Sequence, residues 1–161
     1  LRGLGLCHGL PGQADQEMSA WDFPDPFTQT VRVLGTHIDV LAHANNAVYV
    51  NWCQDVAWAH SEHLGVAPSA YRELDRAMAV RTATYEYLDA ALEGEELEIG
   101  TWITASDARL QMRRHFQMRR VRDAATVFRG DWELVCIRIS SGKPVRMPRL
   151  FLDRYEPAVR R

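Results

Sequence analysis

The residues from His37 to Asn46 form the densest polar cluster of the chain, and Asp39 is the only carboxylate among them. A carboxylate can attack a carbonyl carbon, or take a proton from a water molecule that does so. An apolar helical pattern begins directly after the cluster, and the first N–H groups of a helix can donate to an oxygen that gains negative charge. The cluster therefore predicts a reaction site at which Asp39 acts beside the amides near Asn46.

The elements that must position this cluster are a strand before it and a helix after it. Residues 27–34 alternate apolar and polar side chains, which is typical of a half-buried strand. Residues 47–64 place apolar side chains on neighbouring i, i+4 rows, which predicts a long and mostly buried helix. Asn45 or Asn46 can cap its first turn, and Gly65 can take the left-handed conformation after its last turn.

The rest of the chain predicts an antiparallel meander. Pro68 suits the start of a short helix that runs to Leu74. Strand-like stretches with short polar turns between them follow at residues 77–88, 95–105, 109–122 and 125–139. Only the helix over residues 47–64 is long enough to cover the apolar face of this sheet. We therefore expect an α+β fold in which an antiparallel sheet of about five strands wraps around one long central helix.

The composition is that of a single globular domain. The chain has 161 residues, of which 47% are hydrophobic and 25% charged, and this excludes disordered, collagen-like and coiled-coil classes. The 19 basic and 21 acidic side chains balance, so we expect no nucleic-acid partner. No apolar run approaches the roughly 18 residues of a membrane span, and the N-terminus makes a poor signal peptide. We expect a cytoplasmic protein without membrane association.

We expect three segments along the chain. Residues 1–26 are rich in Gly and Pro and lack periodicity, so they predict an N-terminal arm. Residues 27–148 form the domain, and residues 149–161 an irregular, Arg-rich C-terminal tail. The three cysteines are far apart, which indicates free thiols.

The polar cluster also carries a resemblance to a known family. The matching segments are Gly35-Thr36-His37-Ile38-Asp39, then His43-Ala44-Asn45-Asn46-Ala47-Val48-Tyr49, then Trp52. In these segments the chain resembles the acyl-CoA thioesterases of hotdog fold, typified by 4-hydroxybenzoyl-CoA thioesterase and the bacterial long-chain acyl-CoA thioesterases. The chain departs from the family at Ala42, where a Gly is usual, and at Ala57, where an Arg is frequent. Leu41 stands where the similar plant acyl-carrier-protein thioesterases have a catalytic Asn.

The resemblance implies an enzyme that hydrolyses acyl-CoA to a free acid and coenzyme A, without a bound cofactor. It makes Asp39 the catalytic carboxylate and the backbone amide near Asn46 the group that polarises the thioester carbonyl. With His43, these form the expected catalytic set. A homodimer or homotetramer is implied as well, and two long exposed sheet edges favour it independently.

The expected substrate-binding residues are Asn45, Tyr49, Arg113 and Arg114. Asn45 would help shape the pocket, and Tyr49 reads as a core residue that could also touch substrate. Arg113 and Arg114 belong to an Arg cluster of one strand that could hold the phosphates of coenzyme A. The alternative for this cluster is a solvated strand face or a dimer rim.

Other interpretations of the same residues stay open. Asp39 alone would read as a loop or cap carboxylate. His37, Asp39 and His43 could bind a metal, but no fourth ligand is near, and we predict none. His60 and His63 read as solvated side chains near a helix end. The rival functions are a hotdog hydratase or dehydratase, which the spacing of Asp39 and His43 disfavours, and a non-catalytic acyl-CoA-binding protein.

Overall fold

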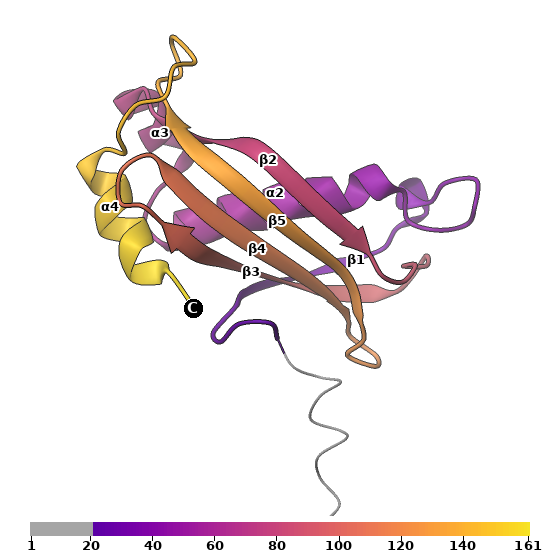
Figure 1. Cartoon of the computed structure of the whole chain (residues 1–161). Coiled ribbons are helices and arrows are strands. Elements are labelled where there is room, and N and C mark those ends of the chain that lie inside the picture. The colour runs from indigo at the N-terminus through magenta and orange to yellow at the C-terminus, as the bar shows by residue number, and fades with distance from the viewer. Residues whose placement is uncertain (1–20) are drawn as a thin grey trace, which may run out of the picture.

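The computed structural model describes residues 21–161, and five strands form one antiparallel sheet in the order β1-β3-β4-β5-β2 (Figure 1). The strands are β1 (Phe27–Arg32), β2 (Ala77–Tyr87), β3 (Glu96–Ser106), β4 (Gln111–Arg120) and β5 (Thr126–Ile137). The helices are η1 (Gly35–His37), α2 (Asn46–His63), α3 (Pro68–Leu74), α4 (Arg149–Tyr155) and η2 (Glu156–Ala158). The predicted strands agree with the observed ones to within two residues at each end.

The long helix α2 lies across one face of the sheet, which confirms the expected architecture (Figure 1). Its first turn is capped by Asn45, whose side-chain oxygen accepts from the Ala47 N–H at 2.9 Å. Gly65 follows its last turn with φ +94°, the left-handed region that favours glycine. Cys53 and Val56 on its inner side are fully buried, as are core residues of the strands.

The interior between α2 and β4 contains an arginine and a histidine in addition to apolar side chains. The Arg114 side chain contacts α2 by a hydrogen bond of 2.9 Å between its Nη1 and His60 Nδ1, and it also donates to Thr101 at 3.3 Å. His60 is 7% exposed and stacks on Phe27. The prediction that His60 is solvated is therefore wrong: it lies on the inner side of the helix, where the sheet covers it. His63, by contrast, is exposed.

The outer face of the sheet is covered in part by the segment just before β1. Trp21 packs edge-on against Trp102, with ring centroids 5.7 Å apart. Gly100 makes room for it, because a Cβ there would lie 2.7 Å from the Trp21 ring. Asp22 forms ion pairs with His115 at 2.9 Å and Arg129 at 2.7 Å. Residues 21–26 of the predicted arm therefore pack on the sheet, and residues 1–20 lie outside the described part.

The C-terminal residues are not the irregular tail that their composition predicts. They form α4 and η2, and Phe151 and Tyr155 are buried against the core at 0% and 1% exposure. Val159 then forms a parallel bridge with Ile103 at the end of β3. The spacing of four between Phe151 and Tyr155 indicates this helix, since it places both rings on one helical face.

Two further expectations concern the cysteines and the membrane. Cys53 and Cys136 are buried free thiols. Among the helices of residues 21–161, none combines the length and apolar character needed to cross a membrane.

Burial of His60 makes the stability of the fold depend on pH. Burial, together with the charge of Arg114, lowers the pKa of His60 from 6.5 to about 3. Below pH 6.5 the unfolded chain therefore binds a proton that the folded chain does not, and the free energy of unfolding falls as the pH falls. We expect His60 to lower the free energy of unfolding by about 2 kcal/mol between pH 7 and pH 5, and urea unfolding at the two pH values measures this. His60→Gln, which cannot take up a proton, should lack this loss, and an unchanged loss in the variant would contradict the assignment.

Candidate active site

The loop between η1 and α2, residues 38–45, lies beyond one end of the sheet and carries Asp39 and His43 of the predicted catalytic set, and Asn46 follows it as the first residue of α2 (Figure 1). Its two sides are held together by an antiparallel bridge between Ile38 and Ala44. The Asp39 N–H donates to the His43 carbonyl at 2.9 Å, and the Ala42 N–H donates to the Asp39 carbonyl at 3.0 Å. Ala42 has φ +61°, so the usual Gly of the resembling family fits a backbone conformation that this chain keeps with an alanine.

The Asp39 carboxylate is half-buried and fixed by one of its two oxygens. Oδ1 accepts from the Leu41 N–H at 2.8 Å. Within residues 21–161, Oδ2 accepts no hydrogen bond, so it can bind a water molecule or face a carbonyl carbon. Asp39 therefore makes the local contact expected of a loop carboxylate, and this contact fixes the carboxylate through one oxygen and leaves the other open. The neighbouring Val40 and Leu41 are apolar yet 101% and 70% exposed.

The first turn of α2 leaves one amide free at this loop. Asn45 satisfies two of the early amides, since its side chain accepts from Ala47 and its carbonyl accepts from Val48 at 2.9 Å. The Asn46 N–H has no acceptor among the described residues. Asn45 is thus the cap, and the backbone amide of Asn46 itself is the donor available to an oxyanion.

Two tyrosines and the connection between β2 and β3 hold this helix end in place. The Tyr87 hydroxyl donates to the Asn46 carbonyl at 3.2 Å, and the Tyr49 hydroxyl accepts from the Ala91 N–H at 3.1 Å. Ala44 in turn donates to the Ala91 carbonyl at 2.9 Å. Tyr49 is only 3% exposed, and burial raises its pKa. The structure therefore places Tyr49 in the core, where it positions the loop.

The two histidines of the cluster, His37 and His43, lie in different surroundings. His37 Nδ1 accepts from the Leu34 N–H at 3.0 Å, and its ring meets the edge of Trp52. The His43 side chain is exposed. In the part of the chain that the structure describes, no three His, Cys, Asp or Glu side chains are placed to hold a metal ion together.

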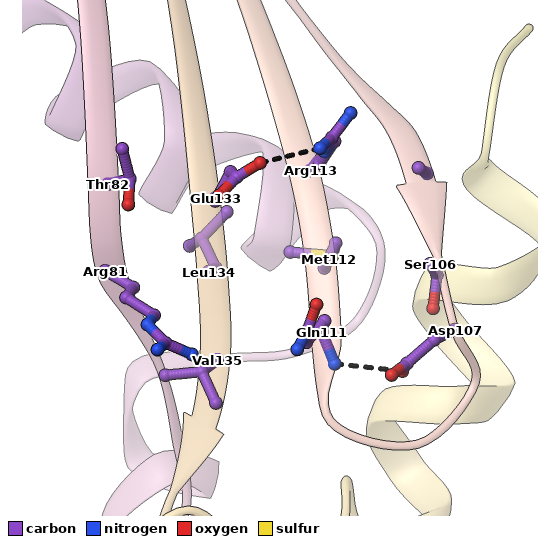
Figure 2. A pocket seen from close by; sticks show the side chains of 11 residues that line it. Arg81, Thr82, Ser106, Asp107, Gln111, Met112, Arg113, Glu133, Leu134 and Val135 are labelled. Atoms are coloured by element: carbon purple, nitrogen blue, oxygen red, sulfur yellow. Dashed lines mark hydrogen bonds and ion pairs between the residues drawn. The ribbon is translucent and has the colours of Figure 1, made fainter.

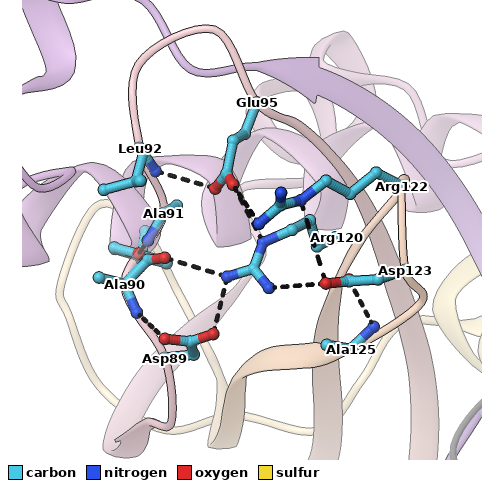
Figure 3. A network of polar contacts seen from close by, with 10 residues as sticks. Asp89, Ala90, Ala91, Leu92, Glu95, Arg120, Arg122, Asp123 and Ala125 are labelled. Atoms are coloured by element: carbon cyan, nitrogen blue, oxygen red, sulfur yellow. Dashed lines mark hydrogen bonds and ion pairs between the residues drawn. The ribbon is translucent and has the colours of Figure 1, made fainter.

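An ion-pair network around Arg120 fixes the connection between β2 and β3 (Figure 3). Its guanidinium lies 2.8 Å from Asp89, 3.2 Å from Glu95 and 3.1 Å from Asp123, although the side chain is only 7% exposed. It also donates to the Ala90 carbonyl at 3.2 Å. The hydrogen bond that Arg120 donates to Asp89, followed by the one to Asp123, raises the pKa of Arg120. The next residue, Ala91, contacts both Tyr49 and Ala44, so the network helps to fix the position of the loop over residues 38–45.

The structure does not bring Arg113 and Arg114 together. As neighbours in β4 their side chains point to opposite faces of the sheet. Arg114 is buried against α2, whereas Arg113 pairs with Glu133 at 2.7 Å on the outer face. Arg113 lines a depression of about 440 Å³ near the far ends of β3 and β4, away from Asp39 (Figure 2). The two arginines therefore cannot grip one phosphate group, and Arg114 does not line the outer surface.

Sequence reasoning missed the buried roles of Arg114 and Arg120. A signal for Arg114 exists in the alternation of β4, because Met112, Phe116 and Met118 are the apolar positions and Arg114 has the same parity. Arg120 has the same parity, but its carboxylate partners carry no such signal, since Asp89 and Glu95 come from the β2–β3 connection and Asp123 from the β4–β5 turn. Only the tertiary structure shows that they converge.

The Arg120 network gives a prediction for stability. Arg120→Met removes a nearly buried cation and leaves three carboxylates facing one another, so we expect the melting temperature to fall by roughly 5 °C or more. Arg122→Met is the matched control, because Arg122 also contacts Glu95 but its side chain is 70% exposed. Differential scanning calorimetry should show a much smaller fall for this variant. Equal effects of both changes would contradict the bracing role of Arg120.

Comparison with known proteins places this geometry in a family. Residues 33–155 match the family model of the thioesterase-like superfamily. Curated proteins give no match.

Solved structures share the fold at low sequence identity. The 1,4-dihydroxy-2-naphthoyl-CoA thioesterase from Synechocystis is 16% identical, with a TM-score of 0.73 over 81% of this chain and 96% of its own. The protein SAV2348 from Staphylococcus aureus, solved in complex with CoA, is 17% identical, with a TM-score of 0.76 over 88% and 90%. The 12:0-ACP thioesterase from Umbellularia californica is 18% identical, with a TM-score of 0.74 over 83% of this chain and 50% of its own. The hotdog fold is thereby confirmed, and the chain belongs to the thioesterase-like superfamily.

Proposed function

We propose that this protein is an acyl-CoA thioesterase that converts an acyl-CoA and water into a free acid and coenzyme A. One observation carries the proposal: the half-buried Asp39 carboxylate has a free oxygen in the same loop that ends at the free N–H of Asn46. Family membership supports thioester hydrolysis, and one similar structure contains CoA.

The chemistry needs few groups because the leaving group is good. The Asn46 N–H donates to the carbonyl oxygen and stabilises the negative charge that develops on it. Asp39 either takes a proton from the attacking water or attacks the carbonyl carbon itself, forming an anhydride that water then opens. The carbon–sulfur bond breaks, and the thiolate, whose pKa as a free thiol is about 8.5, leaves without an acid catalyst. His43 and Asn45 shape the entrance to this site.

The first test is the loss of the carboxylate. Asp39→Asn should lower kcat for release of coenzyme A by about 1000-fold or more, because an amide neither attacks nor accepts the proton. Asp153→Asn is the control, since this residue lies in α4 and pairs with Arg149 on the surface. Thiol release from a panel of acyl-CoAs measures both. Near-wild-type turnover by the Asp39 variant, with an unchanged circular dichroism spectrum, would refute the assignment.

We further propose that the active unit is a dimer formed along β2. This edge strand has 11 residues, against six in β1 at the other edge, and it pairs only with β5. Most of it is exposed, including Val80 at 46% and Tyr87 at 42%. A long exposed edge with apolar side chains pairs readily with a second strand.

Such a dimer would complete the site. If two copies of β2 pair antiparallel over their full length, the two-fold axis passes near Thr82, and Ala77 of one chain faces Tyr87 of the other. Tyr87 contacts Asn46 in its own chain. The catalytic loop of each protomer, with its exposed Val40 and Leu41, would therefore lie beside the beginning of β2 in its partner.

Light scattering tests the assembly. At micromolar concentration we expect at least twice the chain mass of 18.4 kDa. Thr82→Glu would place two like charges together at the axis, so it should give a monomer with little activity. Thr28→Glu, on the exposed part of β1, should leave both assembly and activity unchanged. A fully active monomer would exclude the composite site.

A further inference from the structure

A second cavity lies between the C-terminal half of α2 and the beginning of β2. Its volume is about 250 Å³, and most of its lining is apolar or aromatic, with Trp58, Met78, Trp132 and Leu134 among the side chains. Arg114 is the only charged residue among those that line it. The cavity is therefore an apolar space with one cation at its wall.

The Arg114 cation has no counter-ion in the part of the chain that the structure describes. The side chain is 2% exposed, and its hydrogen bonds go to His60 and Thr101. Burial lowers the pKa of Arg114 to about 10, so it stays protonated at neutral pH. His60 is uncharged there and serves as an acceptor. A buried charge without an opposite charge is costly, and an anion entering the cavity would remove that cost.

Hydroxyl groups beside the guanidinium extend the polar wall. The hydroxyls of Tyr71 and Tyr155 lie 2.6 Å apart, and that of Tyr155 donates to Ser61 Oγ at 3.2 Å. Burial raises the pKa of Tyr155, which therefore remains a donor rather than an anion. If Tyr71 donates to Tyr155, the chain of donors ends at Ser61, whose own hydroxyl hydrogen can then serve an acceptor in the cavity.

The cavity is remote from the catalytic loop of its own chain and close to that of a partner. Asn46 and Ser61 are 15 residues apart in α2, which corresponds to roughly 22 Å along the helix axis. In the proposed β2 dimer, however, Met78 and Val80, which line the cavity, would face the C-terminal half of the partner's β2, whose last residue, Tyr87, contacts the start of α2. A thioester bound at the catalytic loop of one protomer would thus extend its acyl group into the cavity of the other.

We propose that the substrate's acyl group ends in a carboxylate, which enters this cavity and binds the Arg114 guanidinium. The inference rests on the proposed thioesterase activity and dimer, and it names the class of substrate that they act on. The planar guanidinium matches a carboxylate in shape and charge. The small volume favours a short or single-ring acyl group over a long hydrocarbon chain.

Matched pairs of substrates test this selectivity. Glutaryl-CoA is compared with pentanoyl-CoA, and 4-carboxybenzoyl-CoA with 4-methylbenzoyl-CoA. In at least one pair, kcat/KM should be about tenfold or more higher for the carboxylate. Arg114→Met should abolish this preference, mainly through KM, while activity on the neutral member persists. Arg113→Met, one residue along β4 on the outer face, should keep the preference.

Several outcomes would overturn the proposal. These are neutral members that react as fast as the carboxylates in both pairs, or a preference that survives Arg114→Met. If that variant does not fold, Arg114→Lys takes its place. Lysine keeps the charge but cannot make the bidentate contact of a guanidinium. The preference for the carboxylate substrate should therefore fall without vanishing, and an unchanged preference would count against the proposal.

A binding measurement separates this inference from the thioesterase proposal. Trp58 and Trp132 line the cavity, so terephthalate should change the tryptophan fluorescence of the wild-type protein, and the neutral 4-methylbenzamide should bind at least tenfold more weakly. If no acyl-CoA is hydrolysed but terephthalate binds in an Arg114-dependent manner, the carboxylate site stands and the thioesterase function fails. If hydrolysis occurs without selectivity and terephthalate does not bind, only the carboxylate site fails.

Discussion

Burial of one helix against one face of the sheet sets the positions of the Asp39 loop and of the buried Arg114. The 18 residues of α2 span roughly 27 Å, so its two ends lie in different surroundings. At the N-terminal end the helix begins at the rim of the sheet and presents a free amide to the Asp39 loop. Its C-terminal half lies over β4 and encloses Arg114 and His60. Packing of a single helix thus leaves a free amide at one end and a desolvated cation near the other.

The two buried arginines of β4 show how differently such a cation can be used. Arg120 meets three carboxylates, and its ion pairs fix the connection that holds Tyr49 and Ala44. Its charge is balanced within the chain, so its role is mechanical. Arg114 meets a neutral imidazole and a hydroxyl, which orient the guanidinium without neutralising it. A side chain that is oriented but not neutralised is prepared for an anion from outside.

Much of this fold follows from local sequence patterns. Alternation along the strands, the i, i+4 rows of α2, Asn45 at its start and Gly65 after its end predict the elements nearly to the residue, because these signals lie within a few positions of one another. The placement of Asp39 in a loop that ends at the start of the helix was predictable for the same reason, since strand, loop and helix start are contiguous. Contacts between distant segments were not predictable. Trp21 on the outer face, the three partners of Arg120 and the burial of His60 depend on which segments the tertiary fold brings together.

The separation of the two ends of α2 has a consequence for how a dimeric site would work. The reacting groups of each site would come from the start of α2 in one protomer, and the acyl pocket from the second half of α2 and β2 in the other. Changes in the cavity, such as those at Trp58 or Met78, would then alter which acyl group fits while leaving the Asp39 loop and its Arg120 support untouched. Different residues would then determine the reaction and the choice of acyl group, and pairing of the β2 edges would bring the two sets together. With such an arrangement, a hotdog protomer would change its substrate through a few residues of one cavity, and the groups around Asp39 would stay as they are.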